Sequence, residues 1–382
     1  MKPAPCPEPA TPTPKRKRRD PRVGEAVIEP TPAAARTPRL GALVGGRDNN
    51  FNLIRMVAAS CVLVSHAESI VHGPDVVEPL EAFFHGTTLG NFAVMVFFAI
   101  SGFLIARSFD RSPGLVRFFL ARFLRLYPAL VVVLVVTVTV AGLGLTDSTM
   151  REFAPAGLKY VGANLSLYRP IWSLPGVFGE NPLGPAINGS LWTLSHEVTC
   201  YLGVVALGLV GALRSKRRML PFLVLFICAY AYLQSAGSDG RLEQLTYLAG
   251  PFAVGAALYV WRDSVPLSFS VGTGLAIATA VAHPTPFFTG ALSISSAYWV
   301  FLLAYLPGGR IRRYNALGDY SYGVYLFAFP IQQLVVDLEP SMSPLANIAV
   351  SFPLTLVCAI LSWKLVEAPS LALLRRRDAR AA

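Results

Sequence analysis

The chain has 382 residues, of which 53% are hydrophobic and 14% charged, and it carries a formal net charge of +11. A soluble domain has about 25% charged residues, and the charges here are clustered between long uncharged runs, so an ordinary soluble protein is excluded. The composition predicts a polytopic membrane protein.

The first 47 residues are rich in proline and contain a basic run at residues 15–19, but no apolar stretch of the kind that a signal peptide needs. We expect a disordered cytoplasmic tail. The basic run would in principle suit nucleic acid, but beside a membrane domain contact with anionic lipid explains it better, so we expect no nucleic-acid partner. The five cysteines have no metal-ligand spacing, and we expect neither a metal site nor a disulfide framework.

Runs of about 17–25 apolar residues follow and predict an all-α membrane domain of about ten transmembrane helices over residues 48–370. The runs lie at residues 52–72, 89–107, 125–145, 191–212, 219–235, 243–261, 265–282, 287–306, 318–337 and 345–366. The seventh and eighth are the least distinct, because Pro284 and Pro286 leave little room for a loop. Residues 371–382 are expected to form a second basic tail in the cytoplasm.

The basic residues predict the orientation. With both termini in the cytoplasm, 28 of the 33 lysines and arginines fall in cytoplasmic segments, and Arg55 lies within the first span. Four fall outside: Arg151, Lys159, Arg169 and Arg241. This asymmetry follows the positive-inside rule.

The longest predicted outer segment, residues 146–190, is rich in proline and glycine and carries Tyr160, Tyr168 and Trp172. These aromatic residues suit a mobile cover over a sugar acceptor. An interfacial aromatic belt explains them equally well.

Arg55 and His66 stand eleven positions apart in the first predicted span. On one helix they share a face, about 16 Å apart along the axis. An arginine inside a span is costly unless it has a partner, and a histidine can exchange a proton near neutral pH. The pair therefore predicts a reaction or a pathway through the membrane, with a polar helix–helix contact as the simpler alternative.

Glu197 lies near the outer end of the fourth predicted span, with Tyr201 one turn later on the same face. We expect Glu197 to reach the depth of His66 and to orient its imidazole for proton abstraction. In the second span, Ser101 can bond across a helix interface, and the adjacent Gly102 permits close helix approach.

Arg122 and Arg125, just before Pro128, share a helix face at the predicted cytoplasmic surface. Arginine forks suit phosphates such as those of a coenzyme A thioester, although ordinary membrane anchoring explains any single arginine. Asp319 and Glu367 are acidic residues at this basic surface, and pairing with arginines is their simplest explanation.

Together these segments resemble the membrane acyltransferase-3 family, which includes O-acetyltransferases of bacterial surface polysaccharides. The resemblance covers roughly residues 49–370 and rests on motifs in the family's order: Arg55 with His66, Phe97-Phe98 with Ser101-Gly102-Phe103, Arg122 with Arg125 and Pro128, Trp192-Thr193-Leu194 with Glu197 and Tyr201, Gly318 with Ser321-Tyr322 and Tyr325-Leu326, and Glu367 with Pro369. In one departure, Ala328 stands where the family often has a histidine.

The resemblance implies an O-acyltransferase of the bacterial inner membrane that moves an acyl group, usually acetyl, from acetyl-CoA or another acyl-CoA to a carbohydrate hydroxyl. It implies membrane lipids and polysaccharide-assembly proteins as partners. Carried over to this sequence, the catalytic residues are His66, Glu197 and Arg55, the donor-binding residues Arg122 and Arg125, and the supporting residues Ser101, Tyr201 and Trp192.

Two other functions are compatible with the sequence. One is a proton-coupled transporter or flippase of a lipid-linked glycan, in which Arg55, His66 and Glu197 form a proton relay. The other is a catalytically inactive scaffold of a polysaccharide-assembly complex, an idea that Ala328 supports.

Overall fold

The computed structural model describes Met1 and residues 37–381, apart from residues 47, 85, 113, 236–239 and 284. Across these residues the regular structure is helical, and a single isolated β-bridge joins Arg39 to Pro266. The predicted all-α fold is therefore confirmed for the described part of the chain. Most of the predicted N-terminal tail, residues 2–36, lies outside the described residues.

The end of that predicted tail packs against the helices. Here α1 (Leu40–Leu43) forms, and the side chain of Leu40 is fully buried. The backbone N–H of Leu40 donates to the carbonyl of Val265 at 2.9 Å, and that of Gly41 donates to the carbonyl of Arg262 at 2.8 Å. The packed part of the chain thus begins about ten residues before the predicted boundary at residue 48.

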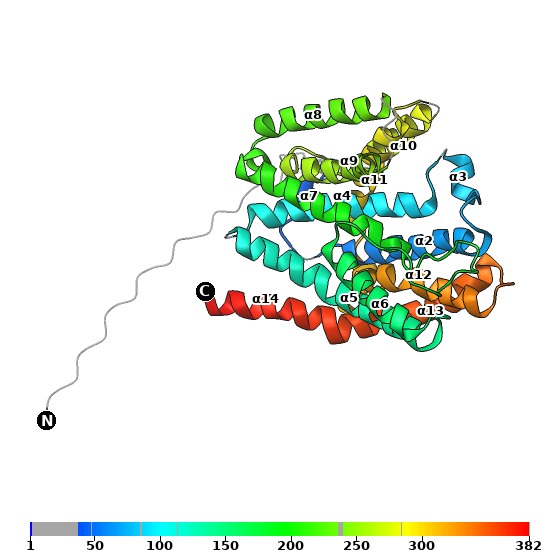
Figure 1. Ribbon diagram of the computed structural model, residues 1–382. Helices are drawn as coiled ribbons and strands as arrows, with labels where there is room; N and C mark the ends of the chain where they lie inside the picture. Colours follow the sequence, from blue (N-terminus) through cyan, green and yellow to red (C-terminus); the bar gives the residue numbers. More distant parts are fainter. Residues whose placement is uncertain are drawn as a thin grey trace. The chain divides into compact units, whose positions relative to one another are not determined.

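Each of the ten predicted spans coincides with a helix (Figure 1). In chain order these are α2 (Phe51–His72), α4 (Leu89–Asp110), α5 (Leu115–Gly144), α7 (Trp192–Leu209), α8 (Lys216–Ser235), α9 (Arg241–Val260), α10 (Phe269–Ala282), α11 (Phe288–Tyr305), α12 (Ser321–Leu338) and α13 (Pro344–Ser362).

Five described helices are long and apolar enough to cross a membrane: α2, α4, α5, α11, and α13 together with its continuation. The chain is therefore a membrane protein, while the count of ten spans stays a prediction. The α10 helix has 14 residues, so it extends about 21 Å, less than the hydrocarbon core of about 30 Å.

The remaining elements are shorter or lie between the predicted spans. They are α3 (Pro79–Phe83), α6 (Met150–Ser166), the 3₁₀ segments η1 (Gly189–Leu191), η2 (Ala212–Arg214) and η3 (Gly309–Ala316), the π-helical turn η4 (Trp363–Glu367), and α14 (Ala368–Ala381). Because η4 joins α13 to α14 without a loop, the predicted C-terminal tail continues the last helix.

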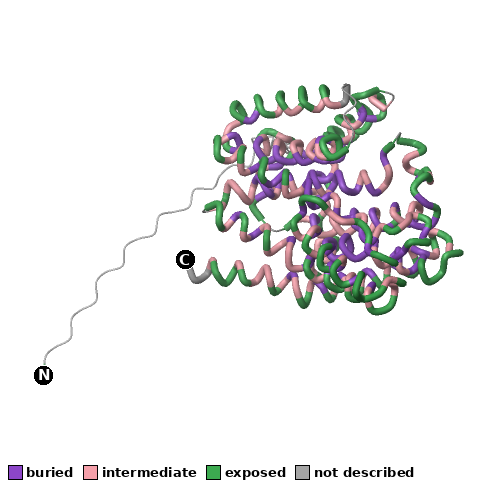
Figure 2. Tube along the Cα trace, in the orientation of Figure 1, coloured by how far each residue is buried: buried purple, intermediate pink, exposed green. Residues whose placement is uncertain are grey.

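Three helices, α2, α4 and α12, form the centre of the bundle. The α9 and α11 helices pack on α4, α13 packs on α12 and α2, and α5 carries α6 and α14. Figure 2 shows buried residues concentrated along the central helices, whereas α8 is largely exposed and the described side chains of α14 are intermediate or exposed. Many exposed side chains of α5, α8 and α13 are apolar, which suits a surface in contact with lipid.

The contact between α4 and α9 depends on two glycines. A Cβ atom on Gly102 would overlap the backbone carbonyl of Phe252, and a Cβ atom on Gly255 would overlap the carbonyl of Ala99. The backbones of the two helices therefore touch directly, as small residues permit inside membranes. The predicted close approach at Gly102 is confirmed.

Replacing Gly102 by alanine is expected to lower the free energy of unfolding by about 1–3 kcal/mol, because the methyl group must push two backbones apart. Thermal unfolding in mild detergent, followed by tryptophan fluorescence, measures the effect. The matched control is Gly274→Ala in α10, where the new methyl group meets nothing within 4 Å. Equal stability of the two variants would contradict a backbone contact between α4 and α9.

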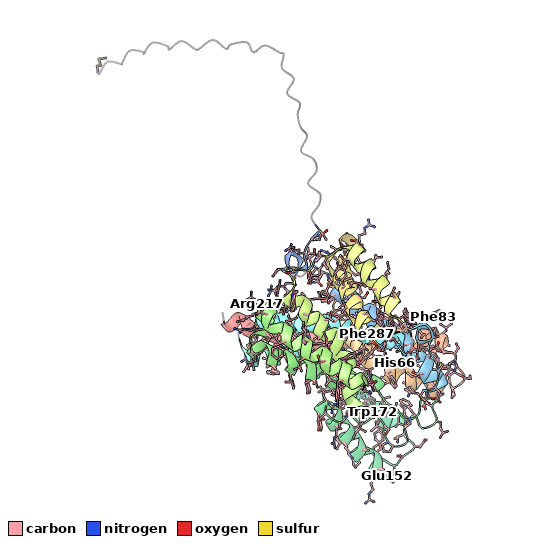
Figure 3. All side chains as sticks on the ribbon, turned by 90° about the horizontal axis from the view of Figure 1, so that it is seen from above. His66, Phe83, Glu152, Trp172, Arg217 and Phe287 are labelled. Atoms are coloured by element: carbon pink, nitrogen blue, oxygen red, sulfur yellow. The ribbon has the colours of Figure 1, made fainter. Side chains whose placement is uncertain are left out.

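The two ends of the bundle are named here from α2. The Arg55 end is the end at which α2 begins, and the His66 end is the end at which it finishes. Figure 3 shows Arg217 toward the first end and Phe83 and Trp172 toward the second. In the predicted orientation the Arg55 end faces the cytoplasm.

The His66 end is covered by the segment 167–188. Leu174, Phe178 and Ile187 are buried there. Asn181 donates from Nδ2 to Oε1 of Gln333 in α12 at 2.9 Å, and Gln333 donates in turn to the carbonyl of Ala186. This part of the predicted outer segment is therefore fixed to the end of α12 by specific hydrogen bonds, and Leu183 and Ala186 pack on the apolar cluster that includes Ile70 and Val71 at the end of α2.

Candidate active site

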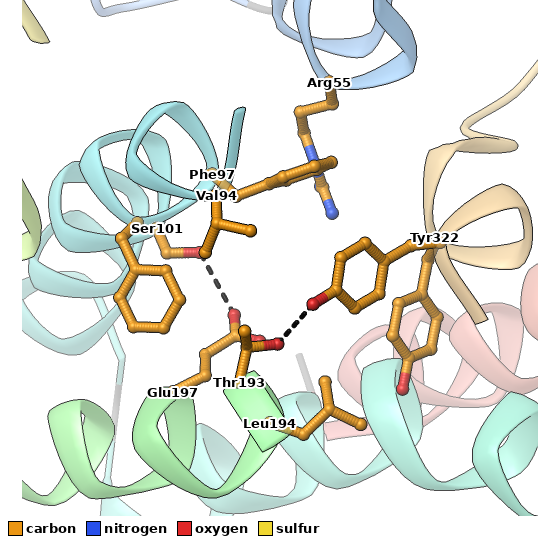
Figure 4. Close-up of a pocket in the computed structure, with 10 residues that line it drawn as sticks. Arg55, Val94, Phe97, Ser101, Thr193, Leu194, Glu197 and Tyr322 are labelled. Carbon is orange, nitrogen blue, oxygen red and sulfur yellow. Dashed lines mark hydrogen bonds between the residues drawn. The ribbon is translucent and has the colours of Figure 1, made fainter. Parts of the chain in front are cut away.

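A small pocket, with a cavity volume of about 40 Å³, lies between α2, α4, α7 and α12 toward the Arg55 end (Figure 4). Its lining combines aromatic and aliphatic side chains with a few polar groups: Arg55, Val94, Phe97, Phe98, Ser101, Thr193, Leu194, Glu197, Tyr322 and Tyr325. An apolar chamber with convergent polar groups is the usual form of a small-molecule site.

Glu197 is the carboxylate of this pocket. It accepts a hydrogen bond from the Tyr201 hydroxyl at 2.5 Å and one from the Ser101 hydroxyl at 3.1 Å. The expected neighbourhood of these three residues is confirmed, because the i, i+4 spacing in α7 and the facing turn of α4 bring their side chains together.

Arg55 enters the same pocket from α2. Its guanidinium lies 5.8 Å from the centroid of the Phe97 ring and pairs with Asp319 at 3.0 Å. Asp319 also pairs with Arg125 at 2.6 Å, and Arg125 pairs with Glu367 at 3.6 Å. These four residues form an ion network that joins α2, α5, the turn before α12 and the π-helical turn η4. The predicted pairing of Asp319 and Glu367 with arginines is confirmed.

The two candidate donor-binding arginines differ in their surroundings. Arg125 faces two carboxylates, whereas Arg122 has no ion-pair partner among the described residues, and its buried Nε atom makes no hydrogen bond there. Arg122 is close enough to interact electrostatically with Glu197 and Tyr201. Of the pair, Arg122 therefore has the free hydrogen-bonding capacity that a phosphate requires.

His66 lies at the other end of α2. Its ring makes an edge contact with Phe329 in α12, with 5.1 Å between centroids, and the same Phe329 ring packs against Gly189 at the start of η1. The Nδ1 atom of His66 is buried and has no hydrogen-bond partner in the described part of the chain. The site thus presents an imidazole with unused hydrogen-bonding capacity.

The expected pairing of Glu197 with His66 is wrong. The chain reaches the level of His66 already at Gly189, so Glu197, eight residues further along, lies about 12 Å closer to the Arg55 end. Its hydrogen bonds go to Ser101 and Tyr201 instead. Arg55 and His66 do lie in one helix and both meet α12 or the turn before it, as their spacing predicts.

A second polar residue near His66 is Gln332 in α12. Its side chain is fully buried, and its Nε2 donates to the carbonyl of Leu63, one turn before His66, and to Asn347. The Oε1 atom of Gln332 has no partner among the described residues. Gln332 lies one turn after Ala328, so a polar side chain is present on this helix face although the family's histidine is missing.

Hydroxyl groups connect the pocket with the region of His66. The Thr193 and Tyr325 hydroxyls are 2.6 Å apart, and the Tyr325 hydroxyl also donates to the carbonyl of Ser190. The adjacent Trp192 does not line the pocket, and its ring packs against His196 instead. Trp192 is therefore a neighbour of the site rather than part of its wall.

A second cavity lies at the His66 end, between α2, α3 and α13. It is lined by Val64, Ser65, Glu68, Glu78, Pro79, Leu80, Phe83, Leu89, Leu345 and Ile348. Residues 64, 65 and 68 occupy the face of α2 that is largely opposite His66. This cavity is therefore separate from the candidate active site.

Glu78, in the wall of the second cavity, joins α2 to the start of α4. Its carboxylate accepts hydrogen bonds from the Ser65 hydroxyl and from the backbone N–H of Leu89. Burial raises the pKa of Glu78, and these two hydrogen bonds lower it without reversing the shift. With a folded-state pKa above the unfolded value of about 4.3, its contribution to stability is present at low pH and is lost as the pH rises through the folded-state pKa.

The melting temperature of the wild-type protein is expected to fall as the pH rises from about 4, in part because Glu78 ionises. In a Glu78→Gln variant this fall is therefore expected to be smaller. Melting temperatures measured across this pH range in one detergent check the slope. Glu180→Gln, which removes an exposed carboxylate at the same end, is the control and keeps the wild-type slope. A Glu78→Gln slope equal to that of wild type would contradict the raised pKa.

Some residues of the site were not predicted as such. Tyr322 and Tyr325 belong to a motif seen in the sequence, and their i, i+3 spacing was the signal that they share a face. Gln332 and Gln333 are two amides in an apolar run, which is itself unusual inside a membrane.

The fold and the site define a class of protein. An all-helical membrane protein with an apolar pocket, buried cations at one end and a free imidazole at the other has the parts of a transferase that acts inside the membrane. The chain belongs to the acyltransferase-3 family, because a family model described as an acyltransferase domain matches residues 48–364.

Two relatives add detail. An O-acetyl transferase of Shigella phage Sf6 is 29% identical over 348 residues, which cover 84% of this chain and 95% of that protein. Nodulation protein 10 of Rhizobium leguminosarum bv. viciae is 29% identical over 369 residues, 86% of this chain and 94% of that protein. No solved structure matches this chain.

Proposed function

We propose that this membrane acyltransferase moves an acyl group, most simply acetyl, from cytoplasmic acyl-CoA to a hydroxyl of a surface or secreted carbohydrate, and that it works in the bacterial inner membrane with both termini in the cytoplasm. One observation carries the proposal. Arg55, which lines the pocket, and His66, whose imidazole is free, lie on one helix about 16 Å apart along its axis. This separation suits a donor that is held by its phosphates and reacts at the far end of a long arm. The name of the phage relative supports O-acetyl transfer.

In this proposal the donor's phosphates bind at the Arg55 end. Arg122 supplies the free guanidinium, and Arg125 is held in place by Asp319 and Glu367. The arm of the donor passes through the pocket, which is lined by aromatic side chains and offers polar contacts from Glu197 and Tyr322. The thioester then reaches the level of His66.

His66 takes the proton of the acceptor hydroxyl as that oxygen attacks the thioester carbonyl. The tetrahedral intermediate collapses, the carbon–sulfur bond breaks, and the proton passes from the imidazole to the departing thiolate. The new ester stays on the carbohydrate. The Oε1 atom of Gln332, whose Nε2 donates to the carbonyl of Leu63 one turn before His66, has no partner among the described residues and would accept a hydrogen bond from the imidazole or the acceptor.

Labelled acetyl-CoA added to inside-out membrane vesicles tests this function. Vesicles with the chain are expected to transfer alkali-labile label to glycan, and vesicles without it are not. Mass spectrometry and proton NMR of the surface polysaccharide from the matching strains identify the ester. Unchanged esters with less exported glycan would favour the transporter, and no change in either would favour the scaffold.

A further inference from the structure

Two arginines share one aromatic ring at the His66 end. The guanidinium carbon of Arg241 lies 5.3 Å from the centroid of the Tyr168 ring, and that of Arg169 lies 5.6 Å from the same centroid. Arg241 also donates from Nη1 to the carbonyl of Tyr168 at 2.9 Å. All three residues are exposed, so the group, called here the Tyr168 cluster, is open to a ligand.

The backbone under the Tyr168 cluster is held by several elements. Leu167 ends α6 in the left-handed conformation, with φ of 54°, which turns the chain toward the cluster. Asn164 donates from Nδ2 to the carbonyl of Ile171 at 3.0 Å and closes this turn. On the other side, the carbonyl of Arg241 lies 3.4 Å from Nε2 of His196 in α7. The cluster is thus tied to α6, α7 and α9.

The charges of the cluster are unbalanced. Neither Arg169 nor Arg241 has a carboxylate partner among the described residues. Five other arginines do pair with a carboxylate there: Arg55, Arg117, Arg125, Arg214 and Arg312. Two unpaired cations near one ring repel each other, and an anion bound beside them would offset that repulsion.

The location of the Tyr168 cluster also favours a role in binding an anion. In the predicted orientation only four of the 33 basic residues face outward, and two of them are here, so membrane anchoring does not explain them. The covering segment leads from the cluster to the active site: Ile187 donates to the carbonyl of Trp172 at 2.7 Å, and Gly189 packs on Phe329, the ring that contacts His66.

We propose that the Tyr168 cluster is a binding subsite for an anionic group, a phosphate or a carboxylate, that the carbohydrate acceptor carries. Guanidinium groups form charge-assisted, bidentate hydrogen bonds with both anions. The exposed ring of Trp172 offers an apolar face to the sugar next to that group. The inference rests on the proposed function and specifies its acceptor as an acidic or phosphate-linked glycan.

Binding measurements on the purified full-length protein in zwitterionic nanodiscs test this without any acyl transfer. The probes are trigalacturonate, inorganic pyrophosphate and maltotriose, a neutral trisaccharide. We expect trigalacturonate, pyrophosphate or both to bind, and to bind at least about tenfold more weakly to the Arg169→Gln/Arg241→Gln variant, because charge-assisted hydrogen bonds are lost. Arg151→Gln/Lys159→Gln removes the same charge from exposed positions on α6 and is expected to bind like wild type.

The outcomes separate the sources of the anion. Binding of trigalacturonate alone that the Arg169→Gln/Arg241→Gln variant weakens assigns a sugar carboxylate. Binding of pyrophosphate alone that this variant weakens assigns a phosphate linkage. The proposal would be overturned if neither anion bound, or if anion binding were unchanged in the Arg169→Gln/Arg241→Gln variant. It would also be overturned if both double variants weakened anion binding equally, or if maltotriose bound tightly and neither variant changed its binding. The binding test contains no acyl donor, so its result does not depend on acyl transfer. If the cluster bound anions but the protein transferred no acyl group, the proposed function would be refuted and the anion subsite would stand.

Discussion

Replacing His66 by alanine is expected to reduce acyl transfer by about 100- to 10,000-fold, the range that a positioned general base contributes. The buried, unpartnered Nδ1 atom at the level of Phe329 is the reason, because a neutral imidazole with an unused ring nitrogen can take the proton of an alcohol. Transfer of label from acetyl-CoA to glycan, at matched protein levels, measures the effect.

His72 is the control for this experiment. It lies at the last position of the same helix, is exposed, and is expected to tolerate alanine without loss of activity. Activity of His66→Ala close to that of wild type would remove His66 from the mechanism. The same variant also separates two mechanisms, because a covalent acyl-histidine would label wild-type protein in the absence of acceptor and would leave His66→Ala unlabelled.

The second large effect is expected on stability. Asp319 is 10% exposed at its side chain and pairs with both Arg55 and Arg125. An Asp319→Asn variant leaves these guanidinium groups short of one carboxylate in a buried place, so the free energy of unfolding is expected to fall by about 3–5 kcal/mol. Thermal and chemical unfolding in one detergent measure the loss.

Asp48→Asn is the matched control. Asp48 also pairs with an arginine, Arg312, but its side chain is 73% exposed. Because water screens that pair, its loss is expected to cost no more than about 1 kcal/mol. Similar small losses in both variants would mean that the network around Asp319 contributes little to the stability of the bundle.

Much of this architecture follows from local rules. Uninterrupted apolar runs fix where helices form, and a spacing of eleven residues places Arg55 and His66 on one face whatever surrounds them. The pairing of Asp319 with arginines follows from the cost of an unpaired charge away from water. The close contact at Gly102 follows from the missing side chain. Each of these rules needs only one helix or one residue type.

The depth of Glu197 could not be obtained in this way. Counting residues from the predicted start of its helix assumes that all helices begin at the same level. Here the covering segment 167–188 packs over the ends of α2 and α12, so the next helix starts next to Phe329, already at the level of His66. The relative depth of two helices depends on the packing of the segments between them, which no local pattern specifies.

The α6 helix shows a similar limit. Its sequence contains Pro155 and two glycines within a segment rich in such residues, which favours a loop when the sequence is considered alone. In the structure, Phe153 and Tyr160 are buried, and Phe153 packs against Gly142 of α5. Tertiary contact thus outweighs weak helix propensity, as it does in many proteins.

The glycine contact between α4 and α9 has a consequence for how substrates must travel. Two helices that touch backbone to backbone at Gly102 and Gly255 cannot slide or rotate past each other without breaking both contacts. Any motion that accompanies function must therefore carry α4 and α9 together as one unit. In the proposed function this pair stays fixed while the acyl group crosses the membrane.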